Sequence, residues 1–306
     1  MDPLSSITEW PVEDVGAAAI LPGGRVLAAG STTRRFPLAS VTKPLVAMAV
    51  LVAVEEGSLG LDDPAGPPGA TARHLLAHAS GLGPDGDEVL APPATRRIYS
   101  NRGFEVLGEL LEERTDLSAA TYLDDAVLAP LGATDTALEG SPAHGAVGTV
   151  EDLALLTAEL LATEPRVLAR STRDLATTVA WPGLPGVLPG FGPQDANEWG
   201  LGFEIRGRKS PHWTPDDASE ATFGHFGRSG SVLWVDPLAG AALVVLCSRE
   251  FGDWAPPRWR ALGDRVLAAA QGLEQAPAGS QIAPDRQQRP APADVERAVD
   301  DQETAE

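Results

Sequence analysis

The sequence predicts a mixed α/β (α+β) protein: one antiparallel sheet built from both chain ends, flanked by helices, with an inserted, mostly helical lobe. Two observations indicate this fold class. Segments able to form β-strands occur near the start of the 306-residue chain and again after residue 199. Between them, from residue 71 to about 178, apolar residues recur at spacings of three and four, as in amphipathic helices. The simplest assembly of this order is one sheet interrupted by helices.

The first part of the chain predicts a hairpin followed by a buried helix. Residues 14–30 hold two β-capable segments around Pro22-Gly23-Gly24, which favours a tight turn. Residues 42–56 are mostly apolar, with Pro44 in the first turn and Gly57 after the end, as expected for a helix. A loop is expected at 61–70, which contains three Pro and two Gly.

The rest of the chain predicts helices first and strands later. Helical spacing covers 71–78, 102–114, 118–128 and 150–163, and a closing helix is expected at 255–271. A Pro- and Gly-rich loop is expected at 181–195. The runs that favour strands are 199–206, 221–227, 231–236 and 241–248.

These elements predict one domain over residues 1–274. Its sheet lobe would comprise about 10–60 and 199–274, and its helical lobe about 61–198. A ligand site between the two lobes would be natural. From about residue 275 the chain is rich in Ala, Pro and Gln and lacks apolar periodicity, so a disordered tail is expected at 275–306.

Composition excludes several classes of function. The formal net charge of −20 repels phosphate backbones, so nucleic acid is not expected as a partner. The single cysteine, Cys247, excludes an intrachain disulfide and a cysteine-based zinc cluster. The longest apolar run, Leu45 to Val54, is half of the about 20 residues that a membrane span needs. The first residues, Met1 to Leu4, show no secretory signal, so a cytoplasmic location is expected.

Ser40 and Lys43 form the first candidate for chemistry. Only two of the 23 basic residues are lysines, Lys43 and Lys209. Lysine, unlike arginine, can act as a base when its pKa is lowered. Three residues apart at the start of an apolar helix, Ser40 and Lys43 would share a face, and burial would favour a neutral amine that accepts the serine proton. The structural alternative is a helix-capping serine and a lysine that extends to solvent.

Two further motifs contain residues able to hold substrate or move protons. Tyr99-Ser100-Asn101 offers a hydroxyl for proton relay and an amide to hold a carbonyl or the lysine; a turn with Asn as a helix cap is the structural alternative. His225-Phe226-Gly227 lies on a predicted strand edge. His225 could donate a hydrogen bond to a substrate carboxylate or to the tyrosine, and Gly227 would let a substrate lie against the strand.

Other candidates are weaker. His74 and His78 lie four residues apart, but no acidic residue completes a metalloprotease motif, so no metal is expected. Gly81 to Gly86 matches a dinucleotide motif by letters alone, because it follows a helical segment rather than a strand. Cys247 would be a buried structural thiol. Three tryptophans could line an acyl pocket or simply pack in the core: Trp181, Trp199 and Trp213.

In chain order the three motifs read Ser-x-x-Lys, Tyr-x-Asn and His-x-Gly, which resembles the order found in penicillin-recognising serine enzymes. From about Val15 to Ala270 the chain is similar to serine β-lactamase-like hydrolases. The resemblance is strongest to class C β-lactamases, family VIII carboxylesterases and D-amino-acid-peptide hydrolases. Further stretches typical of that family are Phe36 to Lys43, His74 to Leu82, Trp199 to Phe203 and Leu233 to Pro237.

The resemblance implies a β-lactamase/transpeptidase-like fold and a role for each motif residue. Ser40 would be the nucleophile, with Lys43 and Tyr99 sharing the general-base work. Asn101 would orient Lys43 or a substrate amide, and the backbone N–H groups of Ser40 and Arg228 would form the oxyanion hole. His225 would match the first residue of the third motif, and Gly227 would complete that motif.

Two departures from the family pattern bear on the substrate. Phe226 stands where many relatives have threonine, and His225 replaces the lysine of most β-lactamases. Both changes favour a neutral small-molecule ester or amide over an antibiotic. The resemblance therefore predicts a carboxylesterase-like serine hydrolase that forms an acyl-enzyme without a cofactor. The alternatives are a β-lactamase or D-stereospecific peptidase, and a non-catalytic binding protein on the same fold.

Overall fold

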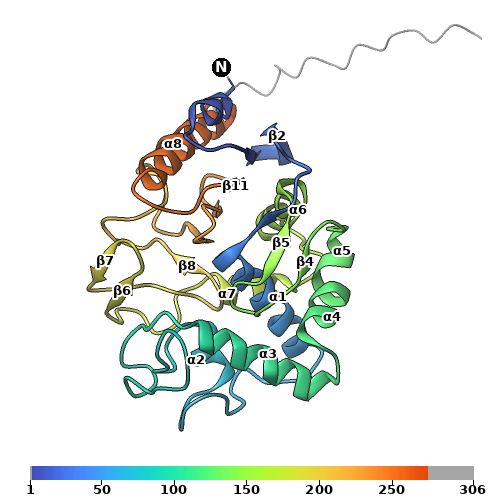
Figure 1. Cartoon of the computed structure of the whole chain (residues 1–306), viewed down its shortest axis with the longest axis vertical. Helices are drawn as coiled ribbons and strands as arrows, with labels where there is room; N and C mark the ends of the chain where they lie inside the picture. The colour runs from blue at the N-terminus through green and yellow to red at the C-terminus, as the bar shows by residue number, and fades with distance from the viewer. Residues whose placement is uncertain (1, 275–306) are drawn as a thin grey trace, which may run out of the picture. The chain divides into compact units, whose positions relative to one another are not determined.

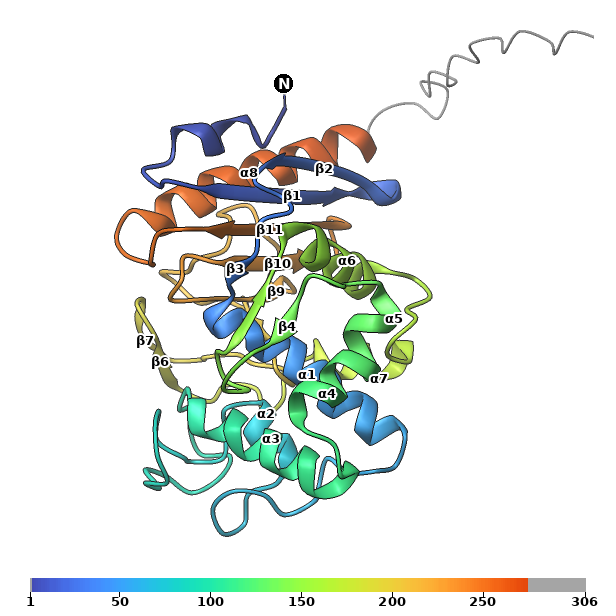
Figure 2. The same cartoon turned by 45° about the vertical axis from the view of Figure 1, so that its right-hand side comes forward.

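Strands from the beginning and the end of the chain pair in one six-stranded antiparallel sheet with the order β2-β1-β11-β10-β9-β8. This computed structural model describes residues 2–274. The disordered tail expected at 275–306 therefore lies outside the described residues. Figures 1 and 2 show the sheet from two directions. Its strands are β1 (Val15–Leu21), β2 (Arg25–Gly30), β8 (Glu204–Ile205), β9 (Phe223–Phe226), β10 (Val232–Asp236) and β11 (Ala241–Cys247).

Both faces of the sheet are buried at its centre, and β11 shows why. Its side chains alternate between two apolar clusters, as the two-residue period of a strand requires. Ala242, Val244 and Leu246 face helices α1 (Thr42–Glu55) and α6 (Val150–Leu161). The intervening side chains face α8 (Ala255–Glu274), which covers the other side of the sheet (Figure 2). A strand buried on both faces needs apolar residues at every position, and the sequence of β11 has them.

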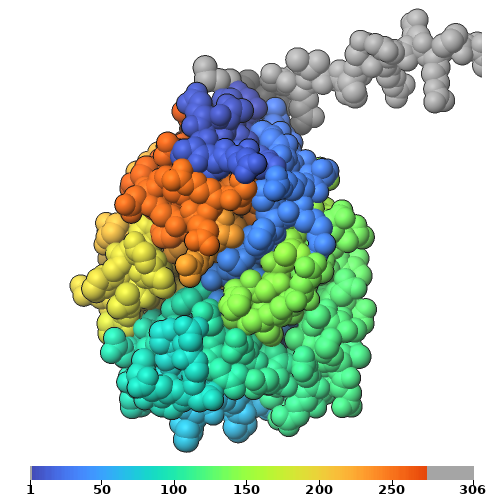
Figure 3. Space-filling view, viewed as in Figure 1, coloured from blue at the N-terminus to red at the C-terminus, as the bar shows by residue number. Residues whose placement is uncertain are grey.

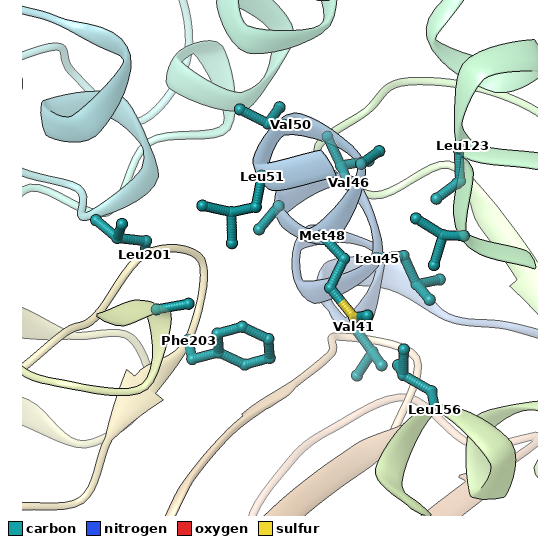
Figure 4. Close-up of a cluster of buried hydrophobic side chains, with 14 of the residues drawn as sticks. Val41, Leu45, Val46, Met48, Val50, Leu51, Leu123, Leu156, Leu201 and Phe203 are labelled. Carbon is teal, nitrogen blue, oxygen red and sulfur yellow. The ribbon is translucent and has the colours of Figure 1, made fainter. Parts of the chain in front are cut away.

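Helix α1 lies at the centre of the larger apolar cluster. Twelve of its 14 residues, from Thr42 to Ala53, are buried. A helix that is apolar on all sides is stable only where protein surrounds it. Figure 4 shows its side chains meeting residues from other elements, among them Leu123, Leu156 and Phe203. This burial fixes the helix whose first turn carries Lys43.

The helical part contains short helices between longer ones. Residues 118–128, expected as one helix, form α4 (Ala119–Leu123) and a π-helical turn, Asp124–Leu128, before α5 (Ala129–Leu131). Helix α6 contacts β1, β10 and β11, so it covers the sheet although it falls in the range expected for the helical lobe. The remaining helices are α2 (Ala72–Leu76), α3 (Asn101–Thr115) and α7 (Arg170–Ala176).

Two small sheets lie outside the main one. β3 (Phe36–Pro37), β5 (Ala146–Gly148) and β4 (Ala137–Leu138) form a three-stranded sheet beside the start of α1. Within 181–195, expected to be a loop, β6 (Gly186–Leu188) and β7 (Gly192–Gln194) pair as a hairpin. The strand expected at 199–206 is confined to β8. No helix within residues 2–274 is both long enough and apolar enough to span a membrane.

Candidate active site

Ser40 lies in a strained turn that precedes α1. It belongs to a 3₁₀ turn, Ala39–Val41, and the residue before it, Ala39, has a φ of 46°. This left-handed conformation is costly for a residue with a Cβ and persists where neighbours hold it. The turn is held through Leu38, whose N–H donates to Ala146 O at 2.9 Å and whose carbonyl accepts from Ser231 Oγ at 2.7 Å. Ser40 does not cap the helix. The N-cap residue is Val41, and no side chain forms a capping hydrogen bond there.

Ser100 places the two residues beside it in the site. As the N-cap of α3 it accepts from Gly103 N at 3.0 Å, and it donates to Gly83 O at 2.6 Å. Asn101 is therefore not the cap. With the loop fixed, Tyr99 Oη donates to Ser40 Oγ at 2.7 Å. Asn101 Oδ1 accepts from Lys43 Nζ at 2.8 Å. Residues distant in sequence thus meet as the motifs predict.

Lys43 is fully buried and does not extend to solvent. Its Nζ also donates to Ala143 O at 2.9 Å and lies 4.5 Å from the centre of the Tyr99 ring. Burial lowers the pKa of Lys43 to about 7, and the carboxylates of Asp85 and Glu105 only partly oppose this shift. A neutral amine has two N–H donors, which these two acceptors satisfy, so its lone pair is free to take a proton.

Tyr99 remains a neutral phenol. Burial raises its pKa above the ordinary value, and the hydrogen bond to Ser40 offsets only part of that rise. No hydrogen bond joins Lys43 directly to Ser40 in the part of the chain that the structure describes. Tyr99 instead contacts both residues, through its hydroxyl to Ser40 and through its ring to the Lys43 amine.

His225 is set up to accept a hydrogen bond rather than to donate one. Its Nδ1 lies 2.7 Å from Phe226 O, an acceptor, so Nδ1 carries the proton. Burial first, and then the Lys43 charge, lower the pKa of His225 to about 3. The ring is therefore neutral, and its buried Nε2 has no partner within residues 2–274. The expected donation to a substrate carboxylate does not fit this tautomer.

Gly227 also differs from its expected role. A Cβ at this position would lie 2.5 Å from Leu38 O and 3.1 Å from Ala39 Cβ. The space that a side chain would occupy is thus filled by the turn that carries Ser40, not left open for a substrate. The glycine lets the end of β9 pack directly on that turn. Arg228, the next residue, then reaches the same site as Ser40.

Two cavities meet at Ser40 and Arg228. The larger, here called the polar cavity, has a volume of 590 Å³ and is lined by Asn101, Asp85 and Glu250 among others. The smaller, called the apolar cavity, has a volume of 270 Å³ and is lined mainly by aromatic and aliphatic side chains. These are Tyr99, Leu188, Pro189, Trp199, Phe226 and Phe251, with His225 and Glu204 beside them. Ser40 thus has a polar compartment on one side and an apolar one on the other.

The two residues expected to supply the oxyanion donors both lie at this junction. The backbone N–H groups of Ser40 and Arg228 donate to no carbonyl outside their own secondary-structure elements in residues 2–274. Both residues line both cavities. Figure 3 shows the helical part in teal and green and the sheet part in blue and orange. On this face the two parts meet across the middle of the molecule. The cavities draw residues from both parts.

The remaining sequence candidates have other partners. Trp199 lines the apolar cavity, whereas Trp181 stacks on His74, and Trp213 is buried against His212. His78 accepts from Ser100 N at 3.1 Å and packs against Tyr99. Cys247 is a buried free thiol. The described residues include no group of three His, Cys, Asp or Glu side chains placed to hold a metal.

A buried ionic cluster beside the apolar cavity escaped the sequence analysis. Glu204 accepts from His212 Nε2 at 2.7 Å and Trp213 Nε1 at 2.9 Å, and pairs with Lys209 Nζ at 2.8 Å. Burial opposes ionisation of Glu204, but Lys209 and His212 outweigh it and hold the pKa of the carboxyl well below its usual range. The one available signal was Lys209, the second of the chain's two lysines.

Comparison with known proteins identifies the family of this chain. The family model described as Beta-lactamase matches residues 14–267. This chain belongs to the beta-lactamase family. The crystal structure of a beta-lactamase (Mb2281c) from Mycobacterium bovis is 53% identical and has a TM-score of 0.85, covering 88% of this family member and 99% of that chain. The predicted fold class is confirmed.

Curated relatives with different names match only part of the chain. Esterase EstB of Burkholderia gladioli is 33% identical over 33% of this chain and 37% of its own length. Penicillin-binding protein 4* of Bacillus subtilis is 29% identical over 34% of this chain and 31% of its own length. The matched segments therefore span about a third of these relatives, and both an esterase and a penicillin-binding protein resemble this beta-lactamase family member.

Proposed function

We propose that this protein is a serine hydrolase that cleaves carboxylic esters through an acyl-enzyme. Ser40 Oγ attacks the carbonyl carbon. The Tyr99 hydroxyl turns from Ser40 toward the Lys43 lone pair, so that the serine proton moves to Tyr99 Oη as the phenol proton moves to Lys43. The N–H groups of Ser40 and Arg228 stabilise the oxyanion. The carbon–oxygen bond to the alcohol then breaks, and Lys43 returns the proton to the leaving alkoxide. Water repeats these steps on the acyl-enzyme and releases the acid.

The observation that carries this proposal is the 2.7 Å bond from Tyr99 to Ser40, next to a lysine whose pKa is about 7. A general base works best when its pKa lies near the working pH. Asn101 and the Ala143 carbonyl hold the Lys43 amine in place. A non-catalytic binding protein would not need a serine bonded to a tyrosine that covers a lysine with a near-neutral pKa. This arrangement therefore favours an enzyme.

The state of His225 favours an ester over a β-lactam. A β-lactam antibiotic carries a carboxylate, which a protonated lysine or a donating hydroxyl would bind. Here a neutral imidazole presents an unprotonated Nε2, and Phe226 adds no hydroxyl. An anion would be repelled by the nitrogen lone pair, whereas a neutral ester is not.

β-Lactam hydrolysis is the second candidate, and two observations favour it. The 53% identical relative is described as a beta-lactamase. Arg228, whose side chain is 85% exposed, lies where the two cavities meet and could pair with a carboxylate.

Two measurements test the proposal. A fluorescent phosphonate that reacts with activated serines should label the protein and fail to label Ser40→Ala, while the control Ser58→Ala, outside both cavities, should be labelled normally. Turnover of p-nitrophenyl butyrate is then compared with that of a chromogenic cephalosporin. We expect kcat/KM to be at least tenfold higher for the ester. Absence of Ser40-dependent labelling would contradict a hydrolase, and faster turnover of the cephalosporin would favour the second candidate.

A further inference from the structure

A third cavity, here called the outer groove, adjoins the apolar cavity. It has a volume of 450 Å³ and is lined by Pro84, Leu90, Ile98 and Val187, together with Arg96 and Arg97. Tyr99 and Pro189 line both the outer groove and the apolar cavity. The two cavities therefore adjoin at the residue that contacts Ser40.

Exposed apolar side chains gather at this groove. Eight large apolar side chains are exposed among the residues that the structure describes, and three of them, Val89, Leu90 and Val187, lie in this region. Leu90 and Val187 line the groove itself and are 48% and 51% exposed. Scattered single apolar residues are ordinary, but a cluster beside a catalytic cavity marks a binding surface.

Two elements are joined to form the walls of the groove. One wall is strand β6, where Leu188 faces the apolar cavity and Val187, on the opposite face, lines the groove. The other wall is the segment before α3, which is joined to β6 by a parallel bridge between Arg97 and Gly186 and bonds from Arg97 N to Pro185 O at 2.8 Å, just before the strand. The Arg97 guanidinium donates to four backbone carbonyls, those of Ala77, Ala180, Trp181 and Asn197, so four of its five N–H donors are occupied within the protein.

We propose that the acyl chain of the ester substrate extends from Ser40 through the apolar cavity, passes between Tyr99 and Pro189, and lies in the outer groove. This inference rests on the proposed esterase function and names its substrate class: esters of long, unbranched fatty acids. The alcohol leaves through the polar cavity, through which water also enters.

The volumes set the chain length at which the groove begins to matter. A cavity of 270 Å³ has room for about nine groups the size of a water molecule, at about 30 Å³ each. Since a methylene group occupies a similar space, an acyl chain of up to about eight carbons fits in the apolar cavity. A twelve-carbon chain must continue into the outer groove.

The test measures kcat/KM for p-nitrophenyl acetate, butyrate, octanoate and dodecanoate, each below its micelle concentration. Each newly buried methylene should raise kcat/KM by up to about fourfold, the equivalent of ~0.8 kcal/mol. We expect at least a tenfold rise from acetate to octanoate and no loss at dodecanoate. In the double variant Leu90→Asp/Val187→Asp, the dodecanoate-to-butyrate ratio should fall by about tenfold. The control Val26→Asp, equally exposed on β2 at the far edge of the sheet, should leave that ratio unchanged.

The outcomes separate this inference from the function on which it rests. Ser40-dependent hydrolysis of butyrate, combined with a steady loss of kcat/KM beyond it or an unchanged ratio in the double variant, overturns the acyl-chain assignment alone. Failure to hydrolyse any of the four esters overturns both proposals. An equal effect of Val26→Asp would show that added surface charge, not the groove, sets the ratio, and would also overturn the assignment.

Discussion

At the residue scale, the surroundings of Lys43 fix what its amine can do. Two acceptors hold it, the Tyr99 ring covers it, and water does not reach it. Because burial away from water disfavours the charged form, the lysine is a base rather than a fixed cation. Arginine cannot replace it in that role, since a guanidinium has a pKa above about 12.

Lys43→Arg is therefore expected to lower kcat by about 10² or more, the usual effect of losing a general base. The pH profile gives a second reading. The neutral amine is the active form, so kcat/KM should be low on the acid side and rise through a pH of about 7. A well-folded arginine variant that keeps more than roughly a third of kcat, or a flat profile between pH 5 and 9, would contradict the base role.

The motif residues show which parts of a site can be predicted from sequence. Ser40, Lys43, Tyr99 and Asn101 were predicted because the chemistry restricts the residue types and their spacing. The Ala143 carbonyl that holds Lys43 was not predictable, since any residue could supply a carbonyl. The tautomer of His225 and the packing role of Gly227 depend on contacts with Phe226 O and Leu38, which only the folded backbone creates.

At the element scale, local patterns predicted the elements with strong signals. The first hairpin, α1 and the closing helix α8 are confirmed because turn residues and long apolar periodicity mark them. The β6–β7 hairpin was missed because Pro and Gly dominate its sequence. The position of β11 between β1 and β10 is set by pairs such as Ala18 with Val244, far apart in sequence, which no local pattern encodes.

The loop after β8 depends on the buried pair of Glu204 and Lys209. Removing one member of a buried ion pair leaves the other charge uncompensated, which typically costs about 3–5 kcal/mol. Lys209→Met should therefore lower the free energy of unfolding by that amount in urea denaturation. The double variant Glu204→Gln/Lys209→Met should be more stable than Lys209→Met by at least ~1 kcal/mol, because no unpaired carboxylate remains. A single variant within 1 kcal/mol of the parent protein would show that the pair does not stabilise this loop.

At the scale of the whole molecule, the net charge of −20 acts on every substrate that approaches. Such a charge slows the association of anions, and salt screens the effect because the Debye length is about 10 Å at 0.1 M. Raising ionic strength from 0.02 to 0.3 M should therefore increase kcat/KM severalfold for a cephalosporin, which is an anion. The value for p-nitrophenyl butyrate, which is neutral, should stay constant. Equal responses of the two substrates would show that the long-range field does not act at this site.

The burial of Lys43 and Lys209 has a consequence for the chemistry of the surface. These are the only lysines in the sequence, and both are less than 5% exposed. A reagent that acylates amines therefore meets no lysine side chain on the folded protein. Each lysine becomes reactive only when the structure around it opens, so the rates of modification at the two positions report the opening of the active site and of the Glu204 cluster separately. The protein thus contains two native probes of its local unfolding.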